Sequence, residues 1–320
     1  MKETETPVTG KPHSGPRILI IGNSGQVGRE LERSFAGYGS VTAVSRAIVD
    51  LTDAESLRAV VRKAAPDVIL NAAAYTAVDR AESEPELAHA VNAAAPAVLA
   101  EEARARKALL VHYSTDYVFD GTKREPWTEV DPVNPLSVYG ASKLAGEQAI
   151  AAVGGKYLIF RTSWVYGPHG KNFLFTMLRL GRERDKLSIV DDQFGAPTTS
   201  IELADATRKV VEGVLNGDHG KLTDWSGIYH MTCADSTSWF GFAQAIFARA
   251  AAKLSSKTPE LTPIPSEAYP TPAKRPRNSV LSNEKLAQRF GVQLASWSTA
   301  LDAVIDELAK AQDSRKANLQ

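Results

Sequence analysis

An apolar run that leads directly into a glycine-rich turn and a helix start constrains this chain more than any other feature. The stretch "RILIIGNSGQVGRELERSF" contains glycines at Gly22, Gly25 and Gly28, followed by apolar residues at helical spacing. A glycine turn between a strand and a helix aims backbone N–H groups and the helix dipole at one point, where a pyrophosphate can bind. An ordinary βα turn would use similar residues, so the GxxGxxG spacing alone leaves both readings open.

The alternation of strand and helix continues along the first half of the chain. The apolar runs "SVTAVS", "DVILNAAA", "ALLVHYST" and "KYLIFRTSWVYG" are separated by helical stretches, two of which cover residues 53–65 and 82–107. This pattern predicts an α/β fold with a doubly wound parallel sheet of the Rossmann type. In such sheets ligands bind at the carboxyl ends of the strands.

The second half is less regular and predicts a smaller α+β substrate domain. Helices are expected around Phe173 and over "IELADATRKVVEGVL", a short strand at "KLSIV", and "GIYHMT" as a strand that returns to the sheet. We therefore expect a disordered extension at 1–15, a dinucleotide-binding domain at 16–163 and 198–232, and a substrate domain at 164–197 and 233–320.

Composition excludes several function classes. The 37 basic and 37 acidic residues balance, which gives no general footprint for nucleic acid. The single cysteine, Cys233, cannot form an intramolecular disulfide and suits the reducing cytoplasm. No apolar run reaches the roughly 18 residues of a membrane span. The scattered histidines form no zinc motif, and there is no G-x-S-x-G elbow.

The segment "YGASKLAGE" places Tyr139 and Lys143 four residues apart, on one face of a predicted helix. A surface helix could carry this pair as solvated decoration. An ammonium beside a phenol also favours the phenolate, which suits proton transfer near neutral pH. Thr115, at the end of the strand "ALLVHYST", supplies a hydroxyl that a doubly wound sheet can bring to the same crevice. Together with the glycine turn, these residues favour catalysis.

The candidate cofactor residues follow the strand ends. After the second strand, Ser45 and Arg46 stand where an NAD-selective site carries an acid, and Asp50 is the first acid beyond them. A hydroxyl and a guanidinium suit a 2′-phosphate, so we expect NADPH to be preferred and NADH to be possible. The full expected set, besides Tyr139 and Lys143, is Gly22, Asn23, Ser24, Gly25, Gln26, Val27, Gly28, Ser45, Arg46, Asp50, Leu51, Ala72, Ala73 and Ala74.

The motifs "GNSGQVG", "HYSTDYVFDG", "YGASKLAGE", "FRTSWVYG" and "DDQFGAPT" occur in this order, and the chain resembles the extended short-chain dehydrogenase/reductase family from about Arg17 to past Trp297. The resemblance is to the members that reduce a dTDP-linked keto sugar. It implies hydride transfer from NAD(P)H to C4 of dTDP-4-dehydro-β-L-rhamnose, giving dTDP-L-rhamnose. Tyr139 would donate the proton, Lys143 would stabilise the tyrosinate and bind the nicotinamide ribose, and Thr115 would hydrogen-bond the carbonyl oxygen.

The same resemblance suggests further substrate residues. Trp164, just past a strand end, could lie against the deoxysugar, although a core tryptophan fits the sequence equally well. Arg275 could bind the diphosphate, although a solvated basic loop is the commoner reading of "KRPR". Asp116 is a candidate acid next to Thr115.

Some family members are metal-bridged dimers, and Glu30 fits the first of the acidic positions used there. At the second position, where an acid is expected, the sequence reads "TTSIEL", with Ser200 and Ile201 before Glu202. This departure puts a Mg²⁺ bridge in doubt. We therefore expect no dedicated metal site and either a monomer or a homodimer.

Two other functions remain open from sequence. A nucleotide-sugar epimerase or dehydratase of the same superfamily would share the glycine turn, Thr115, Tyr139 and Lys143. A non-catalytic regulatory subunit, like the one that partners methionine adenosyltransferase, would have the same fold. Net oxidation of NADPH by the keto sugar distinguishes the reductase from both.

Overall fold

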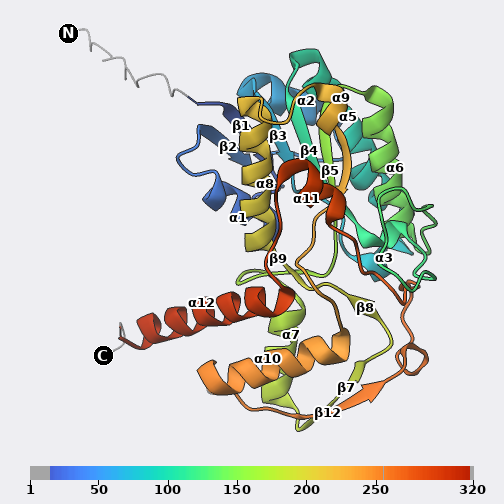
Figure 1. The fold of residues 1–320 in the computed structure, drawn as a ribbon, viewed down its shortest axis with the longest axis vertical. Coiled ribbons are helices and arrows are strands. Elements are labelled where there is room, and N and C mark those ends of the chain that lie inside the picture. Colours follow the sequence, from blue (N-terminus) through green and yellow to red (C-terminus); the bar gives the residue numbers. More distant parts are fainter. Residues whose placement is uncertain (1–14, 255, 318–320) are drawn as a thin grey trace.

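The structure of the protein is a computed structural model that describes residues 15–254 and 256–317. The disordered extension predicted for residues 1–15 lies, apart from Gly15, outside the described residues. Figure 1 shows a sheet covered by helices and, beyond its carboxyl edge, a second group of helices with short strands.

The central sheet has six parallel strands, as predicted. Their spatial order is β10 (Gly227–His230), β5 (Lys156–Thr162), β4 (Leu109–Thr115), β3 (Val68–Asn71), β1 (Arg17–Ile21) and β2 (Ser40–Val44). The chain leaves β1 toward β2 on one side and later returns to build β3 on the other. A doubly wound sheet binds its ligand at this reversal.

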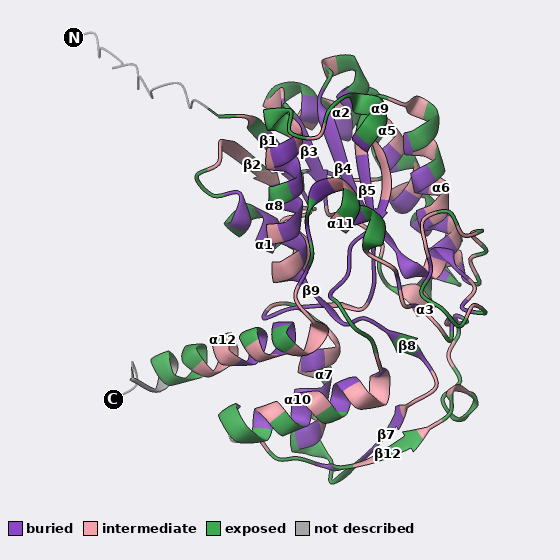
Figure 2. Ribbon diagram, viewed as in Figure 1, coloured by how far each residue is buried: buried purple, intermediate pink, exposed green. Residues whose placement is uncertain are grey.

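Helices cover both faces of the sheet. In β1, every residue after Arg17 is apolar and buried, as expected of a parallel strand whose side chains contact helices on both sides. Ile18 and Ile20 face the core formed with α1 (Gln26–Ser34), α8 (Ser200–Asn216) and α11 (Glu284–Phe290). Leu19 and Ile21 face the opposite core, formed with α2 (Ala54–Ala64), α5 (Ala95–Arg106) and α6 (Val138–Val153). Figure 2 shows the inner strands β1, β3, β4 and β5 as largely buried, whereas the edge strand β2 is partly exposed.

The helix predicted over residues 82–107 is present as one continuous helical run from Pro85 to Arg106, but it starts three residues later than predicted and contains a π turn. The structure has α3 (Val78–Ala81), α4 (Pro85–His89), a π-helical turn η1 (Ala90–Ala94) and then α5. Pro96 has no N–H to donate to the carbonyl of Asn92, four residues earlier, so the α-helical ladder is interrupted there. Gly146 of α6 packs against that carbonyl, where a Cβ would lie 2.1 Å from the Asn92 oxygen. The interruption thus lets α6 approach closely.

A separate hydrophobic core holds the second group of elements together. It lies among α7 (Phe173–Glu183), α10 (Trp239–Leu254) and α12 (Trp297–Ala317), beside the parallel pair β7 (Lys186–Val190) and β12 (Glu260–Ile264). Two shorter strand pairs join the parts: β6 (Val165–Tyr166) with β9 (Thr198–Thr199), and β8 (Phe194–Gly195) with β11 (Thr237–Ser238). The remaining elements are α9 (Leu222–Trp225), η2 (Asp116–Val118) and η3 (Ser266–Ala268).

The domain boundaries drawn from the sequence stay a prediction. Within residues 15–254 and 256–317, no helix is long and apolar enough to cross a membrane.

Candidate active site

The glycine turn after β1 is shaped by contacts that only glycine permits. Gly22 has φ +93°, and a Cβ on it would lie 2.8 Å from the backbone nitrogen of Ala73. A Cβ on Gly28 would lie 2.2 Å from the carbonyl oxygen of Gly22. Within the described chain, no side chain caps the N-terminus of α1 and its first turn carries no acid. The turn therefore offers free N–H groups and a positive dipole end, which fit a pyrophosphate.

The polar side chains of this turn hold neighbouring segments. Gln26 Oε1 accepts a hydrogen bond from Asn172 Nδ2 at 2.8 Å, at the start of α7. Asn23 Nδ2 donates to Glu32 at 3.2 Å, whereas its Oδ1 is buried without a partner. Ser24 is exposed. The Gln26 side chain thus holds α7 beside the turn, and the Asn23 amide oxygen is left without a hydrogen-bond partner.

The end of β2 lies beside the glycine turn, because Gly22 N donates to Val44 O at 2.8 Å. The side chain of Arg46 is exposed, and no carboxylate of the described residues pairs with it. Asp50 is exposed and accepts hydrogen bonds from the backbone and side chain of Thr52, which lower its pKa. Of the predicted residues here, Arg46 is the one with an unengaged cationic group.

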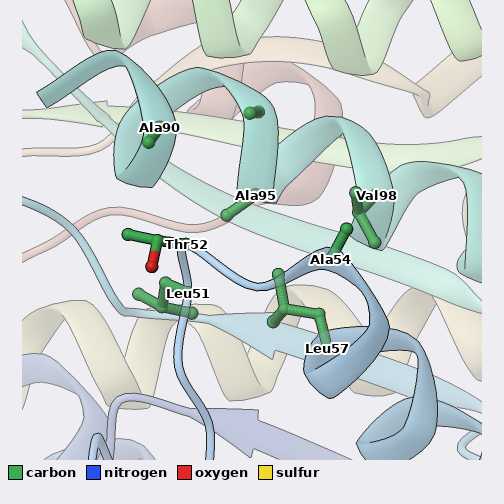
Figure 3. A pocket seen from close by; sticks show the side chains of 8 residues that line it. Leu51, Thr52, Ala54, Leu57, Ala90, Ala95 and Val98 are labelled. Carbon is green, nitrogen blue, oxygen red and sulfur yellow. The ribbon is translucent and has the colours of Figure 1, made fainter. Parts of the chain in front are cut away.

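A small pocket of about 50 Å³ opens next to this turn (Figure 3). Its walls come from the segment after β2, from α2 and from the π turn with α5. The lining residues are Leu51, Thr52, Ala54, Leu57, Ala90, Ala94, Ala95 and Val98.

The three alanines predicted to bind the cofactor follow β3. Ala73 packs on Gly22, and the backbone nitrogen of Ala72 donates to the carbonyl oxygen of Ile21 in β1. The alanines Ala72, Ala73 and Ala74 are partly exposed.

Thr115 and Tyr139 meet at the carboxyl end of β4. Ser137 caps α6 by accepting from Gly140 N at 3.2 Å, which fixes Tyr139 in the first turn of the helix. Burial raises the pKa of Tyr139 to about 12, and hydrogen bonding with Thr115 opposes part of that rise. The ring of Tyr139 packs edge-on against Tyr117 with centroids 5.5 Å apart. The phenol is therefore held in its protonated form, facing a hydroxyl.

Asp116 is buried beside Thr115. Its Oδ1 accepts from the Thr115 hydroxyl at 2.9 Å. Burial raises the pKa of Asp116 to about 6, and hydrogen bonding by Ser279 counteracts some of this rise. Ser279 comes from the C-terminal segment and could not be linked to Thr115 by sequence spacing.

Lys143 lies in the same helix, but its amine points toward the sheet. Nζ is 2.6 Å from the carbonyl oxygen of Tyr113 and 3.1 Å from Nε2 of His112. His112 Nδ1 is in turn 3.0 Å from Nδ2 of Asn71. Burial lowers the pKa of Lys143 to about 8, while the charge of Glu147 opposes that fall. His112 was not among the predicted residues, and its only signal was its place in β4, three residues before Thr115.

A buried ion pair supports the floor of the site. Arg161 of β5 donates to both carboxylate oxygens of Glu147 in α6, at 2.9 and 2.6 Å. Ser114 donates to the same carboxylate at 2.5 Å. All three side chains are less than 5% exposed. This network ties β4, β5 and α6 together beneath Thr115 and was not predicted.

Trp164 follows β5 and has φ +48°, a left-handed conformation that non-glycine residues rarely adopt. Its indole stacks on that of Trp239 in α10. Gly195 packs against the edge of the same indole, where a Cβ would lie 2.6 Å from Cε2. The strained backbone and the stack hold Trp164 in one orientation, and the residue is only partly buried.

Arg275 reaches Asp79 of α3, and their side chains form a 2.8 Å ion pair. The neighbouring Arg277 pairs instead with Glu267 at 2.6 Å. The structure thus separates two arginines that the sequence offers as one cluster. The pairing joins the C-terminal segment to α3, near Tyr117. Burial would lower the pKa of the Arg275 guanidinium, but the hydrogen bond with Asp79 and the other interactions raise it above the ordinary value.

Glu30 is 2% exposed and forms an ion pair with Arg33 of its own helix. Its carboxylate is 2.6 Å from Arg33 and 3.4 Å from His169. Glu202, at the second position considered for a metal, accepts from the backbone of Ala295 at 3.0 Å. Over the part of the chain that the structure describes, no group of three His, Cys, Asp or Glu side chains could hold a metal ion.

The chain is similar over nearly its whole length to proteins of one family. A model of the "RmlD substrate binding domain" matches residues 16–310. A dTDP-4-dehydrorhamnose reductase of Burkholderia thailandensis is 50% identical over 91% of this chain and 99% of its own. That of Escherichia coli K12 is 44% identical over 91% of this chain and 97% of its own.

The fold comparison agrees. The crystal structure of dTDP-4-dehydrorhamnose reductase from Bacillus anthracis, in complex with NADP, superposes with a TM-score of 0.84 at 35% identity and covers 92% of this chain and 99% of that one. The chain therefore belongs to the RmlD family, within the extended short-chain dehydrogenase/reductase superfamily.

Proposed function

We propose that this protein is a dTDP-4-dehydrorhamnose reductase, which reduces the C4 keto group of dTDP-4-dehydro-β-L-rhamnose to give dTDP-L-rhamnose with NAD(P)H. The family membership supports the reaction. The observation that carries the assignment of residues is the phenol of Tyr139 facing the Thr115 hydroxyl at the carboxyl end of β4. A bound nicotinamide cofactor would supply the hydride.

The residues around the glycine turn would hold the cofactor. The free N–H groups at the start of α1 would bind its pyrophosphate, with the Ser24 hydroxyl alongside as a further donor, and Asn23 Oδ1 would accept a hydrogen bond from a hydroxyl of the cofactor. Ala72, Ala73 and Ala74 would border the nicotinamide half. The turn after β2, with Ser45, Arg46, Asp50 and Leu51, would contact the adenosine half. We propose that NADPH is preferred, because Arg46 is exposed and unpaired and can bind a 2′-phosphate.

Proton transfer would fall to Tyr139. Its pKa lies far above neutral, so the hydroxyl proton is present at physiological pH and can be donated to the oxygen of the keto group as an alcohol forms. Thr115 would donate a second hydrogen bond to that oxygen, after its proton turns away from Asp116. Lys143 would bind ribose hydroxyls and stabilise the tyrosinate.

Trp164 would supply an apolar surface for the deoxysugar, and Arg275 would bind the diphosphate. Because Arg275 is paired with Asp79, binding of the diphosphate would exchange one anionic partner for another. Glu30 is already paired with the guanidinium of Arg33, which argues against a Mg²⁺ requirement. A cytoplasmic monomer or homodimer remains our expectation.

The test is the incubation of the purified chain with NADPH and dTDP-4-dehydro-β-L-rhamnose while NADPH absorbance is followed. One NADPH oxidised for each dTDP-L-rhamnose formed supports the proposal. Conversion of the sugar nucleotide without net NADPH loss would instead indicate an epimerase or dehydratase. The absence of any turnover in this assay would favour a non-catalytic regulatory subunit.

A further inference from the structure

Lys143 is a buried amine without a nearby counterion. The residue is 1% exposed, and Nζ contacts a carbonyl oxygen of Tyr113 and a ring nitrogen of His112. Among the described residues, no carboxylate lies within 4.0 Å of Nζ. Burial of an ammonium without an anionic partner costs several kcal/mol. The environment therefore disfavours the charged form of this side chain.

The nearest acid on the same helix does not compensate this charge. Glu147 lies one turn beyond Lys143, but both of its carboxylate oxygens are bonded to Arg161. Ser114 donates a third hydrogen bond to it. Its negative charge is thus largely balanced by a guanidinium that is itself 3% exposed. Glu147 supports the ammonium of Lys143 only at long range.

The hydrogen-bond partners of His112 determine where its proton lies. Asn71 presents its amide nitrogen to Nδ1 at 3.0 Å, and an amide nitrogen can only donate. Nδ1 must therefore accept, and a neutral imidazole then carries its proton on Nε2. His112 is neutral, since burial places its pKa well below the ordinary value and the neighbouring charge of Lys143 lowers it further.

The amide of Asn71 has a preferred orientation. Its oxygen accepts from the backbone nitrogen of Ala73 at 3.3 Å. A rotation that exchanged oxygen and nitrogen would leave two donors facing each other at Ala73. The orientation in the structure satisfies both neighbours, and it directs the proton of His112 toward Lys143.

We propose that Lys143 exchanges between ammonium and neutral amine in the physiological range, and that the arrangement in the cofactor-free protein belongs to the neutral amine, which accepts a hydrogen bond from Nε2–H of His112. One N–H of the amine donates to the carbonyl of Tyr113 in this arrangement. His112 and Asn71 are then positioning residues for Lys143. The titration of Lys143 does not depend on the proposed function. Only its consequence does: the amine that would bind the ribose hydroxyls is not permanently charged.

Two further ionisable groups near Lys143 provide no negative charge that would stabilise its ammonium form. Tyr139, on α6, is neutral because its pKa is raised by burial. Arg161, on β5, is a cation and does not favour a second one. The lowering of the Lys143 pKa to about 8 by burial agrees with the geometry, because both forms are then present near neutral pH.

The test measures the titration of Lys143 directly. Full-length protein without cofactor is prepared with ¹³C at lysine Cε, and the Lys143 signal is identified by its loss in Lys143→Arg. We expect a titration midpoint near pH 8, well below the value of about 10 for an unperturbed lysine. A midpoint above about 10, the value of an unperturbed lysine, would overturn the proposal.

The role of the two positioning residues is tested by reversing the direction of their hydrogen bonds. In Asn71→Asp the new carboxylate accepts from Nδ1–H, so Nε2 becomes an acceptor and favours the ammonium. We expect the Lys143 midpoint to rise by about one pH unit or more. Where Asn71→Asp fails to fold, His112→Gln, which can present a carbonyl oxygen to Nζ, is expected to raise it too.

A matched control is His230→Gln, which alters another buried histidine two strands away and should leave the midpoint in place. An unchanged midpoint in a folded Asn71→Asp or His112→Gln protein contradicts the proposal. The titration needs no cofactor and no substrate. A protein that titrates near pH 8 but reduces no sugar nucleotide would therefore refute the proposed function alone.

Discussion

The indole of Trp164 stacks face to face on the indole of Trp239, with ring centroids 3.5 Å apart and planes inclined by 6°. Phe173 of α7 packs against Trp239 in turn, with centroids 4.6 Å apart. One face of Trp164 is thus covered by residues of the second core. The other face is the one left for a ligand, and Trp239 fixes where that face lies.

We expect Trp164→Ala to raise KM for the sugar nucleotide while kcat changes little, because an apolar platform binds ground state and transition state alike. Trp239→Ala removes the support of that platform and should raise KM by a smaller factor. Trp239→Phe keeps an aromatic ring in the stack and serves as the control. Steady-state kinetics with saturating NADPH measure all three. A KM that stays at the wild-type value in Trp164→Ala would assign this indole to packing alone.

Tyr139→Phe should reduce turnover by about two orders of magnitude or more, with little change in NADPH affinity, because the substitution removes the proton donor and keeps the ring against Tyr117. Lys143→Ala should impair both turnover and NADPH binding. Single-turnover kinetics and fluorescence titration with NADPH separate these effects. Tyr157→Phe, which removes a phenol at the start of β5, is the control. Near-normal turnover in Tyr139→Phe would refute the assigned proton donor.

Much of the sheet could be predicted from the sequence because its strands are continuous apolar runs. Each of the runs containing Ile18, Val68 and Leu109 became a parallel strand, with side chains buried on both faces. The segment from residue 82 to 107 was different. Its alanine-rich pattern indicates a helix, whereas Pro96 and the approach of Gly146 create a π turn. The contact between Gly146 and Asn92 joins residues that are more than 50 positions apart, so the spacing of apolar residues cannot predict it.

The candidate site likewise contains some features that could be predicted from the sequence and others that could not. Thr115, Tyr139 and the glycine turn could be chosen from sequence because each has a local motif. The direction of Lys143 could not, since it depends on His112 and Asn71 from two neighbouring strands. The stacking of Trp164 on Trp239 likewise joins residues far apart in the chain. Hydrogen-bond direction and stacking are set by tertiary contacts.

Gly28→Ala should lower the melting temperature and weaken NADPH binding by at least about tenfold. The new Cβ would lie 2.2 Å from the Gly22 oxygen and 2.6 Å from its carbonyl carbon, so the glycine turn itself must move. Gly37→Ala is a suitable control. A Cβ at Gly37 meets nothing within 4 Å, although its φ of +80° adds strain of about 1 to 2 kcal/mol. Gly37→Ala should therefore lower stability and leave NADPH affinity unchanged; equal affinity loss in both variants would show that general destabilisation is the cause.

Asp116→Asn should stabilise the protein at pH 7. Burial raises the pKa of Asp116 to about 6 from an ordinary value of 3.8, so the native state binds this proton more tightly than the unfolded state does. Wild-type stability from this group is therefore present below pH 4 and is lost as the pH rises through 6. An amide has no such loss, and we expect a gain of about 1 to 3 kcal/mol in the free energy of unfolding at pH 7, which disappears below pH 4.

The control variant, Asp120→Asn, is expected to change the stability at pH 7 in the opposite direction. Hydrogen bonds from Thr122 lower the pKa of Asp120, so its carboxylate contributes stability above its unfolded pKa. Asp120→Asn should therefore lose stability at pH 7. Urea unfolding of both variants at pH 7 and at pH 3.5 measures the difference. A destabilised Asp116→Asn protein at pH 7 would mean that the buried carboxylate is compensated by its partners.

Arg46 decides between the two nicotinamide cofactors if its unpaired guanidinium binds the 2′-phosphate of NADPH. The residue is exposed at the end of β2, beside the glycine turn, and Asp50 is occupied with Thr52. We expect wild-type kcat/KM to be higher for NADPH than for NADH. Arg46→Ala should cost about 1 to 3 kcal/mol of NADPH affinity, the range for hydrogen bonds to charged groups, and little for NADH. Lys310→Ala removes an exposed cation on α12 and controls for the overall charge of the protein. Equal kcat/KM for both cofactors in the wild type, or an equal loss for both in Arg46→Ala, would refute a 2′-phosphate contact and leave Arg46 as a solvated side chain.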